Sequence, residues 1–232
     1  MNKDTTKQSK QIPGESASQS SKVSAYYTQT RPEMLPYIPK NVSKILEFGC
    51  GCGTFARIIK EKYNPEYWGV EICPEAADIA SKKLDKVLAC DATESIDQLP
   101  GNYFDCILFN DVLEHLVDPY TLLKLLKTKL TDNGVVVASI PNVRYWTNFK
   151  KYILHGSWEY TDVGILDKTH LRFFTLSSIK NTFKDLGYEI ISLEGLRPRR
   201  SKTLKFLNIL SMGKLSDVKY LQFACVACPF KS

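Results

Sequence analysis

The stretch Ile45-Leu46-Glu47-Phe48-Gly49-Cys50-Gly51-Cys52-Gly53-Thr54 decides the fold. Residues 44–48 form the short apolar run of a buried strand, glycines follow at positions 49, 51 and 53, and residues 54–63 have the pattern of a helix. Glycines in such a turn bring backbone N–H groups directly against a ligand. A dinucleotide fingerprint would need glycine at position 54, and a phosphate-binding P-loop would need Gly-Lys-Ser/Thr, so the spacing favours neither class.

Strand-like and helix-like segments alternate after this loop, which predicts one sheet covered by helices on both faces. Residues 103–110 (YFDCILFN) form a mostly apolar run, typical of a strand buried on both faces. Leu122, Leu126 and Leu130 recur at helical spacing after Asp118-Pro119, so we expect one helix that ends at Asn133-Gly134. The other expected strands are 67–71, 86–89, 135–140, 189–193 and 220–228, and the other expected helices are 74–84 and 176–186.

Three segments depart from this alternation. Residues 1–22 contain almost no large apolar side chain and are predicted to be a disordered polar tail, which leaves a single domain over residues 23–232. Residues 141–175 form a long polar and aromatic excursion, which predicts a substrate-binding or lid segment. Residues 197–215 are basic and partly amphipathic. Since neither a secretory signal nor an apolar run of roughly 20 residues is present, we expect a cytoplasmic location with reduced cysteines.

The net charge of +6 is unevenly distributed along the chain. Residues 45–195 carry 16 basic and 21 acidic side chains, whereas residues 196–232 carry eight basic and one acidic. The basic residues therefore do not line a groove across the predicted active face, and no nucleic-acid partner is expected. The C-terminal basic group is either a solvated charge run or a contact for phosphates of an acceptor or a membrane surface, and it comprises Arg197, Arg199, Arg200, Lys202 and Lys205.

Two acidic residues stand at the ends of predicted strands. Glu71 ends the second strand, where a carboxylate can accept hydrogen bonds from both ribose hydroxyls of an adenosine ligand. Asp91 follows the third strand and can accept from an adenine amino group. Each acid alone is most often a loop or capping residue. The glycine loop, Glu71 and Asp91 stand at the ends of three consecutive predicted strands. Together they predict a nucleoside site.

Ordered motifs resemble the class I S-adenosylmethionine-dependent methyltransferases: LEFGCGCGTF, the acidic end of YWGVEIC, CDATE, FDCILFNDVLEHLVDP and LTDNGVVVASIPN. The resemblance covers residues 26–193 and is closest to the group with Leu-Glu-His after the fourth strand, which includes quinone-precursor O-methyltransferases. Residues 164–175 (GILDKTHLRFFT) are similar to bacterial methyltransferases associated with sugars and surface polysaccharides. The resemblance implies an α/β Rossmann-like fold with a mostly parallel seven-stranded sheet and an antiparallel last strand.

The resemblance also implies which residues bind S-adenosylmethionine. The glycine loop with Glu47 would hold its amino acid part, Glu71 its ribose, and Asp91 with Ala92 its adenine. Asn110 and Asp111 would lie beside the sulfonium. The full predicted set is Glu47, Gly49, Cys50, Gly51, Gly53, Glu71, Asp91, Ala92, Asn110 and Asp111.

Methyl transfer to a hydroxyl needs alignment of the reacting atoms, exclusion of water and removal of one proton. Histidine suits proton removal near pH 7, and His115 and His170 are the candidate catalytic residues, although either can instead be structural. His115 is the first candidate, because it follows the fourth strand near the expected methyl group. Residues of the excursion can contact the acceptor or pack under a lid; the tentative substrate-binding set is Tyr145, Trp158, Tyr160 and Arg172. No metal is expected, because Asp111 and Glu114 have no further convincing ligand beside them.

The leading hypothesis is an O-methyltransferase for a small or carbohydrate acceptor, such as a sugar nucleotide or a surface glycan. A quinone-like phenol or another lipophilic small molecule is the alternative acceptor. Methylation of nucleic-acid amino groups is disfavoured, because Asn110-Asp111-Val112-Leu113 lacks the Asp/Asn-Pro-Pro-aromatic motif. A non-catalytic cofactor-binding scaffold is an alternative of another class, since a fold does not determine a function.

Overall fold

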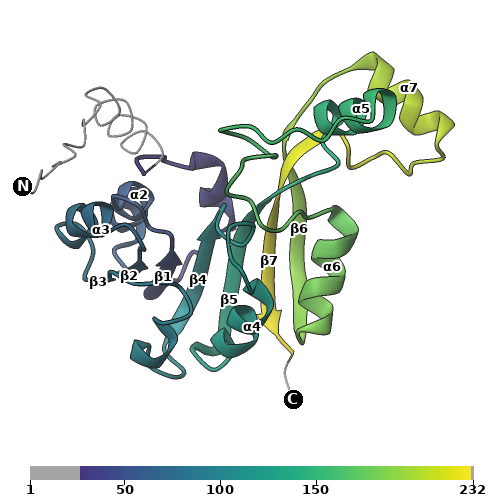
Figure 1. The fold of residues 1–232 in the computed structure, drawn as a ribbon. Helices are drawn as coiled ribbons and strands as arrows, with labels where there is room; N and C mark the ends of the chain where they lie inside the picture. The colour runs from purple at the N-terminus through teal and green to yellow at the C-terminus, as the bar shows by residue number, and fades with distance from the viewer. Residues whose placement is uncertain (1–26, 231–232) are drawn as a thin grey trace, which may run out of the picture.

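The computed structural model describes residues 27–230, so the predicted tail at 1–22 lies outside the described residues. A seven-stranded sheet runs through this part of the chain in the order β3-β2-β1-β4-β5-β7-β6 (Figure 1). The strands are β1 Lys44–Phe48, β2 Glu66–Val70, β3 Lys86–Leu88, β4 Phe104–Asn110, β5 Leu130–Pro141, β6 Tyr188–Pro198 and β7 Tyr220–Pro229. Strands β1 to β5 pair in parallel, and β7 is antiparallel to both of its neighbours. The predicted fold class is confirmed, antiparallel last strand included.

Helices cover both faces of the sheet. The helical elements are η1 Pro32–Tyr37, α2 Thr54–Tyr63, α3 Pro74–Ser81, η2 Ile96–Gln98, α4 Pro119–Leu126, α5 Trp146–His155, α6 Leu176–Asp185 and α7 Lys202–Leu210. Alternate residues of β4 point to opposite faces: Ile107 and Phe109 join the core under α4 and α6, whereas Cys106 and Leu108 join the core under η1 and α2. Residues 103–110 therefore read as apolar because both of their faces are buried.

The helix after Asp118 is shorter than the sequence predicted. It begins as expected, with the Asp118 carboxylate accepting the N–H groups of Tyr120 and Thr121 at 3.1 and 3.0 Å. It ends at Leu126, and Leu130 instead begins β5, opposite Phe104. The helical spacing of Leu130 was misleading, because pairing with β4 governs its position. Gly134 lies within β5, where a Cβ would come within 2.8 Å of the carbonyl oxygen of Phe104.

Two further segments differ from the sequence prediction. The excursion at 141–175 contains helix α5, which has no buried residue. Strand β6 runs to Pro198, five residues beyond the predicted 189–193, because β7 pairs with it over its whole length. This long β6–β7 pair carries α7 away from the sheet, so that α5 and α7 project at one end of the molecule (Figure 1).

Candidate functional site

The carboxyl ends of β1, β2 and β4 meet at one edge of the sheet, and the predicted cofactor residues gather there. A cavity of about 170 Å³ is lined by Tyr27, Gln29, Arg31, Glu47, Gly49, Cys50, Gly51, Phe55, Glu71, Ile72, Asn110 and Asp111. We call it the cofactor cavity. Seven of the ten predicted cofactor-binding residues line it, and Gly53, Asp91 and Ala92 do not.

The glycine loop has the conformation that its sequence predicts. Gly49 and Gly51 have φ angles of +65° and +52°, a region that side chains with a Cβ rarely adopt. A Cβ on Gly51 would come within 2.7 Å of the carbonyl oxygen of Tyr27, which also accepts the N–H of Cys52. The loop is thus closed by the chain preceding η1. Gly53 has a different role: it precedes α2 with φ +70°, and a Cβ there would meet Leu84 at 2.6 Å.

Glu71 is fixed by backbone donors. Its two carboxylate oxygens accept the N–H groups of Gly51 and Cys73 at 2.8 and 2.9 Å. A carboxylate has about four acceptor positions, so both oxygens retain acceptor capacity toward the cavity. This placement fits the ribose role predicted from the strand end. Asp91, by contrast, accepts the N–H of Thr93 at 2.7 Å in the turn after β3.

Glu47 is buried in the wall of the cofactor cavity. It accepts hydrogen bonds from the hydroxyl of Tyr67 and the amide of Asn110, each at 2.8 Å. Burial raises the pKa of Glu47 to about 7, against the lowering effect of these two hydrogen bonds. A cationic group in the cavity would favour the ionised form. Glu47 therefore fits a site for the ammonium of an amino acid ligand.

Asp111 adopts a φ of +55° immediately after β4. It forms an ion pair with Arg31, accepts the hydroxyl of Ser139 at 2.6 Å, and accepts two bonds of 2.9 Å from the amide of Gln222. These partners come from three distant parts of the chain. Sequence reasoning predicted Asp111 but missed Arg31, Ser139 and Gln222, since no local pattern marks them.

A second cavity, of about 280 Å³, adjoins the first; we call it the acceptor cavity. The two cavities share Gln29, Arg31 and Asp111. Ten of the fifteen described residues that line the acceptor cavity have charged or polar side chains, including Glu114, His115, Asp162, Asp167, His170, Arg197 and Gln222. The ion pair of Arg31 with Asp111 therefore stands at the junction between the two spaces.

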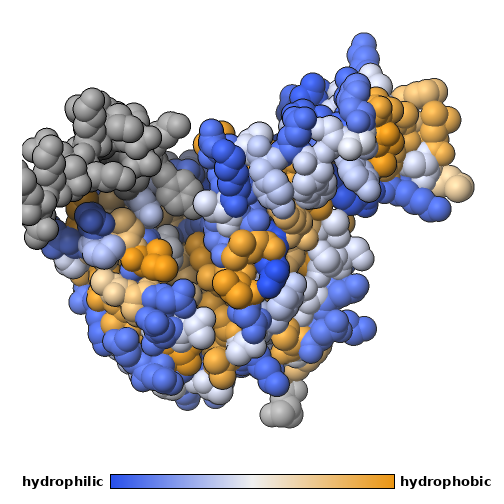
Figure 2. Space-filling model, viewed as in Figure 1, coloured by the Kyte–Doolittle hydropathy of each residue, from blue (hydrophilic) through white to orange (hydrophobic). Residues whose placement is uncertain are grey.

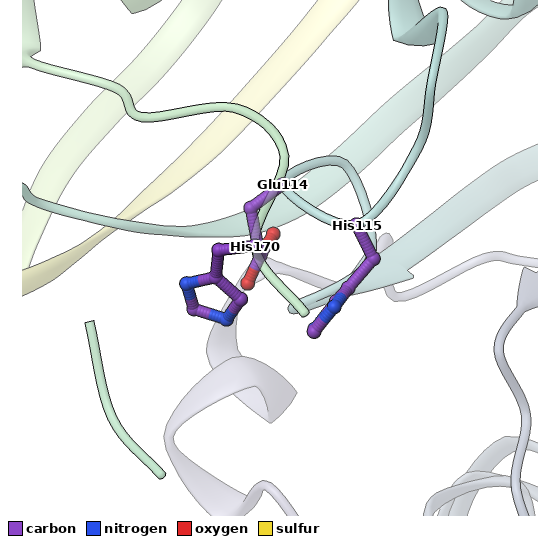
Figure 3. Close-up of side chains that lie close together, drawn as sticks. All are labelled: Glu114, His115 and His170. Carbon is purple, nitrogen blue, oxygen red and sulfur yellow. The ribbon is translucent and has the colours of Figure 1, made fainter. Parts of the chain in front are cut away.

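The turn after β4 and the later segment 170–172 meet at this cavity. The carbonyl oxygen of Glu114 accepts the N–H groups of Leu171 and Arg172 at 2.8 and 3.0 Å. The rings of His115 and His170 pack edge to face, with centroids 4.6 Å apart. The carboxylate of Glu114 points into the space between the two rings (Figure 3). The two candidate catalytic histidines are thus neighbours, although 55 residues separate them.

Hydrogen bonds determine which ring nitrogen of each histidine carries the proton. Nδ1 of His170 lies 2.9 Å from the carbonyl oxygen of Ile165 and must donate to it. Nδ1 of His115 lies 3.1 Å from the hydroxyl oxygen of Thr169, whose proton is donated to Asp167. In the neutral form of either ring, Nε2 is therefore the nitrogen that accepts a proton. Burial, and next the neighbouring His170, lower the pKa of His115, which keeps that ring neutral.

Sequence reasoning weighed Glu114 only as a metal ligand and gave it no part in catalysis. Its side chain is 1% exposed, and neither carboxylate oxygen has a hydrogen-bond partner among the described residues. Burial raises the pKa of Glu114 to about 8. One oxygen of Glu114 and one ring nitrogen of each histidine lie within 4.8 Å of one another. Such a donor set could hold a divalent cation, so the expected absence of a metal stays a prediction.

None of the four tentative substrate-binding residues lines either cavity. The guanidinium of Arg172 donates to the carbonyl oxygen of Val117, which ties the 170–172 segment to the turn after β4. Trp158 and Tyr160 pack around Phe173, with centroid distances of 5.2 and 6.2 Å. Tyr145 precedes α5. The excursion does reach the acceptor cavity, through Pro141, the loop from Asp162 to Asp167, and His170.

The chain is similar to known proteins in sequence and in fold. It is 34% identical over 122 residues to the ubiquinone biosynthesis O-methyltransferase of Bradyrhizobium diazoefficiens, an alignment that covers 50% of this chain and 46% of that protein. The protein of the same name from Rhodopseudomonas palustris is 26% identical over 66% of this chain and 61% of its own length. The chain therefore spans about half the length of the first of these relatives and less than two thirds of the length of the second.

Solved structures show the same fold. An S-adenosylmethionine-dependent methyltransferase from Archaeoglobus fulgidus superposes with a TM-score of 0.62 and 22% identity, over 88% of this chain and 93% of that one. The plantazolicin methyltransferase BpumL, solved with S-adenosylhomocysteine, superposes with a TM-score of 0.59 and 16% identity, over 93% and 92% of the two chains. A family model described as a methyltransferase domain matches residues 20–193. Together with the glycine loop and the strand order, this match shows that the chain belongs to the methyltransferase-domain family and confirms the resemblance to the class I enzymes.

Proposed function

We propose that the chain transfers the methyl group of S-adenosylmethionine to a hydroxyl of a small, polar acceptor. The observation that carries this proposal is the contact between the cofactor cavity and a second, polar cavity whose wall contains two histidines. Bound in the first cavity, S-adenosylmethionine would supply an electrophilic methyl group on a sulfonium, and S-adenosylhomocysteine would leave. An acceptor hydroxyl in the second cavity would approach at the junction beside Asp111.

The residues of the first cavity fit this cofactor. Gly49 and Gly51 present backbone without side chains, and a Cβ at either position would collide with neighbouring atoms at 2.6 or 2.7 Å. Glu71 would bind the ribose hydroxyls and Glu47 the ammonium group. Tyr27 lines the same cavity and would exclude water from it.

The two histidines are the groups that would remove the proton of the acceptor hydroxyl. Nε2 of His170 or of His115 accepts the proton of the acceptor hydroxyl as the new O–C bond forms. In its ionised form Glu114, next to both rings, would stabilise the resulting imidazolium. His170 is the first candidate for this base, because its ring is buried in the cavity wall and is oriented by the loop that faces the acceptor.

The chemistry of the lining favours a hydroxyl-rich acceptor such as a carbohydrate. Hydroxyl groups can pair with the carboxylates, amide and guanidinium groups of this cavity, and among the described residues no phenylalanine, tyrosine or tryptophan lines it. The names of the curated relatives favour the second candidate, a quinone-like phenol. Binding without catalysis, as in a scaffold, would leave the paired histidines without a role.

The test is methyl transfer from labelled S-adenosylmethionine to matched panels of sugar nucleotides, free glycans and catechol-like phenols, with S-adenosylhomocysteine as the readout. We expect turnover with hydroxyl-rich acceptors and its loss in His170→Gln with cofactor binding retained. Turnover with phenols alone would select the second candidate. Tight cofactor binding without transfer to any acceptor or extract fraction would overturn the proposal in favour of a scaffold.

A further inference from the structure

The end of the molecule formed by α5 and α7 exposes large apolar side chains. On α7, Phe206, Ile209 and Leu210 are 61–74% exposed, and Leu204 is the buried residue of that helix. The spacing of Phe206, Ile209 and Leu210 places these three side chains on one side of α7. Met212 follows at 83% exposure, and α5 adds Tyr152, Ile153 and Leu154. Figure 2 shows hydrophobic side chains gathered at this projecting tip.

Basic side chains surround these apolar residues. Residues 196–216 contain no acidic residue, and Asp217 is buried against Arg144 with a contact of 3.0 Å. A groove of about 640 Å³ beside α7 is lined by Arg199, Arg200, Lys202, Lys205 and Lys219, among others. Lys150 and Lys151 are exposed on α5. An exposed apolar stripe flanked by cations alone is complementary to an anionic lipid surface.

The two helices are joined to each other and to the sheet. The N–H of Trp146, at the start of α5, donates to the carbonyl oxygen of Val218 at 2.8 Å, and Arg144 donates to the carbonyl oxygen of Lys214 at 3.0 Å. The chain that follows α7 thus binds the start of α5. The exposed residues of α5 and of 199–214 therefore form one surface, which we call the α5–α7 surface.

This surface adjoins the acceptor cavity. Arg197 lines the acceptor cavity and Pro198 lines the groove beside α7. On the paired strand, Leu221 lines the acceptor cavity and Tyr220 lines the groove. Since Pro198 pairs with Tyr220 in the sheet, the two spaces meet across the end of the β6–β7 pair.

We propose that the α5–α7 surface docks the protein on an anionic membrane, with the apolar residues of α7 inserted between lipid headgroups. Among the described residues, no helix is long and apolar enough to cross a membrane. The proposal goes beyond the proposed methyl transfer and does not depend on it. Such docking would bring the opening of the acceptor cavity to the lipid surface. An acceptor with a polar head and a lipid tail could then enter the cavity from the membrane.

The test is co-sedimentation of the full chain with vesicles of phosphatidylcholine, with and without phosphatidylglycerol. We expect binding to the anionic vesicles that weakens with added salt. Lys202→Gln/Lys205→Gln should weaken this binding about 30-fold, since each lysine near an anionic leaflet contributes about a factor of five. Phe206→Ser/Ile209→Ser should weaken it at least about tenfold. All four side chains are exposed, so the fold and cofactor affinity should stay unchanged.

The matched control is Lys180→Gln/Lys184→Gln, which removes two exposed lysines of α6 and should bind vesicles like the unmodified chain. Equal binding by all variants, or no preference for anionic vesicles, would overturn the proposal. Competition by soluble glycerol phosphate without an effect of the Phe206 and Ile209 changes would also overturn it, in favour of a simple phosphate site. A concentration-dependent dimer lost in Phe206→Ser/Ile209→Ser would identify a second copy as the occupant instead. Cofactor titration of each variant separates these outcomes from failure of the proposed enzyme function.

Discussion

Replacement of Glu114 by glutamine should stabilise the protein at neutral pH. Glu114 is buried, its carboxylate has no hydrogen-bond partner among the described residues, and burial raises its pKa from an ordinary value of 4.5 to about 8. A group whose pKa is raised in the folded state must hold its proton there, whereas the unfolded chain releases it. Folding therefore becomes less favourable as the pH rises above 4.5, and this cost reaches its full size near pH 8.

The expected magnitude follows from this window. Each pKa unit corresponds to about 1.4 kcal/mol. At pH 7, about 2.5 units above the unfolded value, the cost is on the order of 3 kcal/mol. Glutamine has the same shape, does not ionise, and leaves a buried polar group comparable to the protonated carboxyl. Glu114→Gln should therefore gain roughly 3 kcal/mol in free energy of unfolding at pH 7 and almost nothing below pH 4.5.

The assay is urea unfolding of both proteins at a series of pH values from 4.5 to 8, with the midpoint and slope fitted separately. The difference between the two curves isolates Glu114, because Glu47 and the other titrating groups are present in both. Glu94→Gln, a change at an exposed carboxyl, is the matched control and should show no such pH-dependent gain. A constant difference across this window would refute the reasoning. A less stable Glu114→Gln at pH 7 would refute it as well, and would indicate that the carboxylate binds a cation.

Four further predictions concern the two cavities. Glu71→Ala should abolish measurable binding of S-adenosylmethionine in calorimetric titration, since the ribose acceptor is removed; unchanged affinity would contradict the cofactor assignment. Gly51→Val should lose cofactor affinity and stability together because of its positive φ and the 2.7 Å contact, whereas Gly101→Ala, with its nearest neighbour at 3.5 Å, should behave like the unmodified chain. His170→Gln should lower kcat about 10²- to 10⁴-fold with cofactor affinity retained, and a pH–rate profile unaltered in shape would argue against its role as the base. Dialysis against a chelator should leave activity unchanged; a loss restored by zinc or magnesium would overturn the expected absence of a metal.

The parts of the site that the sequence predicted are those encoded by local chemistry. Gly49 and Gly51 indicate a tight loop, in which both residues have positive φ angles. Glu71 can be recognised as an acid at the end of a buried strand. Such features depend on a few neighbouring residues and on the strand that precedes them. The alternation of strands and helices predicted one sheet covered on both faces. The resemblance to the methyltransferases implied that this sheet is mostly parallel with an antiparallel last strand.

The parts that the sequence did not predict depend on contacts between distant residues. Gln222 binds Asp111 across 111 positions, and no pattern near either residue indicates the pair. The bond from the guanidinium of Arg172 to the carbonyl oxygen of Val117, 55 positions away, has no signal in the local sequence either. Leu130 has helical spacing from Leu126, but pairing with β4 places it in a strand. In each case a tertiary contact outweighs the local preference.

The geometry of His170 links acceptor specificity to proton transfer. Its Nδ1 donates to the carbonyl oxygen of Ile165, and the residues from Asp162 to Asp167 line the acceptor cavity. The backbone of the next two residues is fixed to the carbonyl oxygen of Glu114, so His170 cannot follow this loop freely. A displacement of the loop would therefore break the hydrogen bond from Nδ1 to Ile165. The ring would then no longer be held in the tautomer whose Nε2 accepts a proton. Changes in the loop from Asp162 to Ile165 should consequently alter kcat together with KM for the acceptor, whereas a loop that only shaped the cavity would alter KM alone.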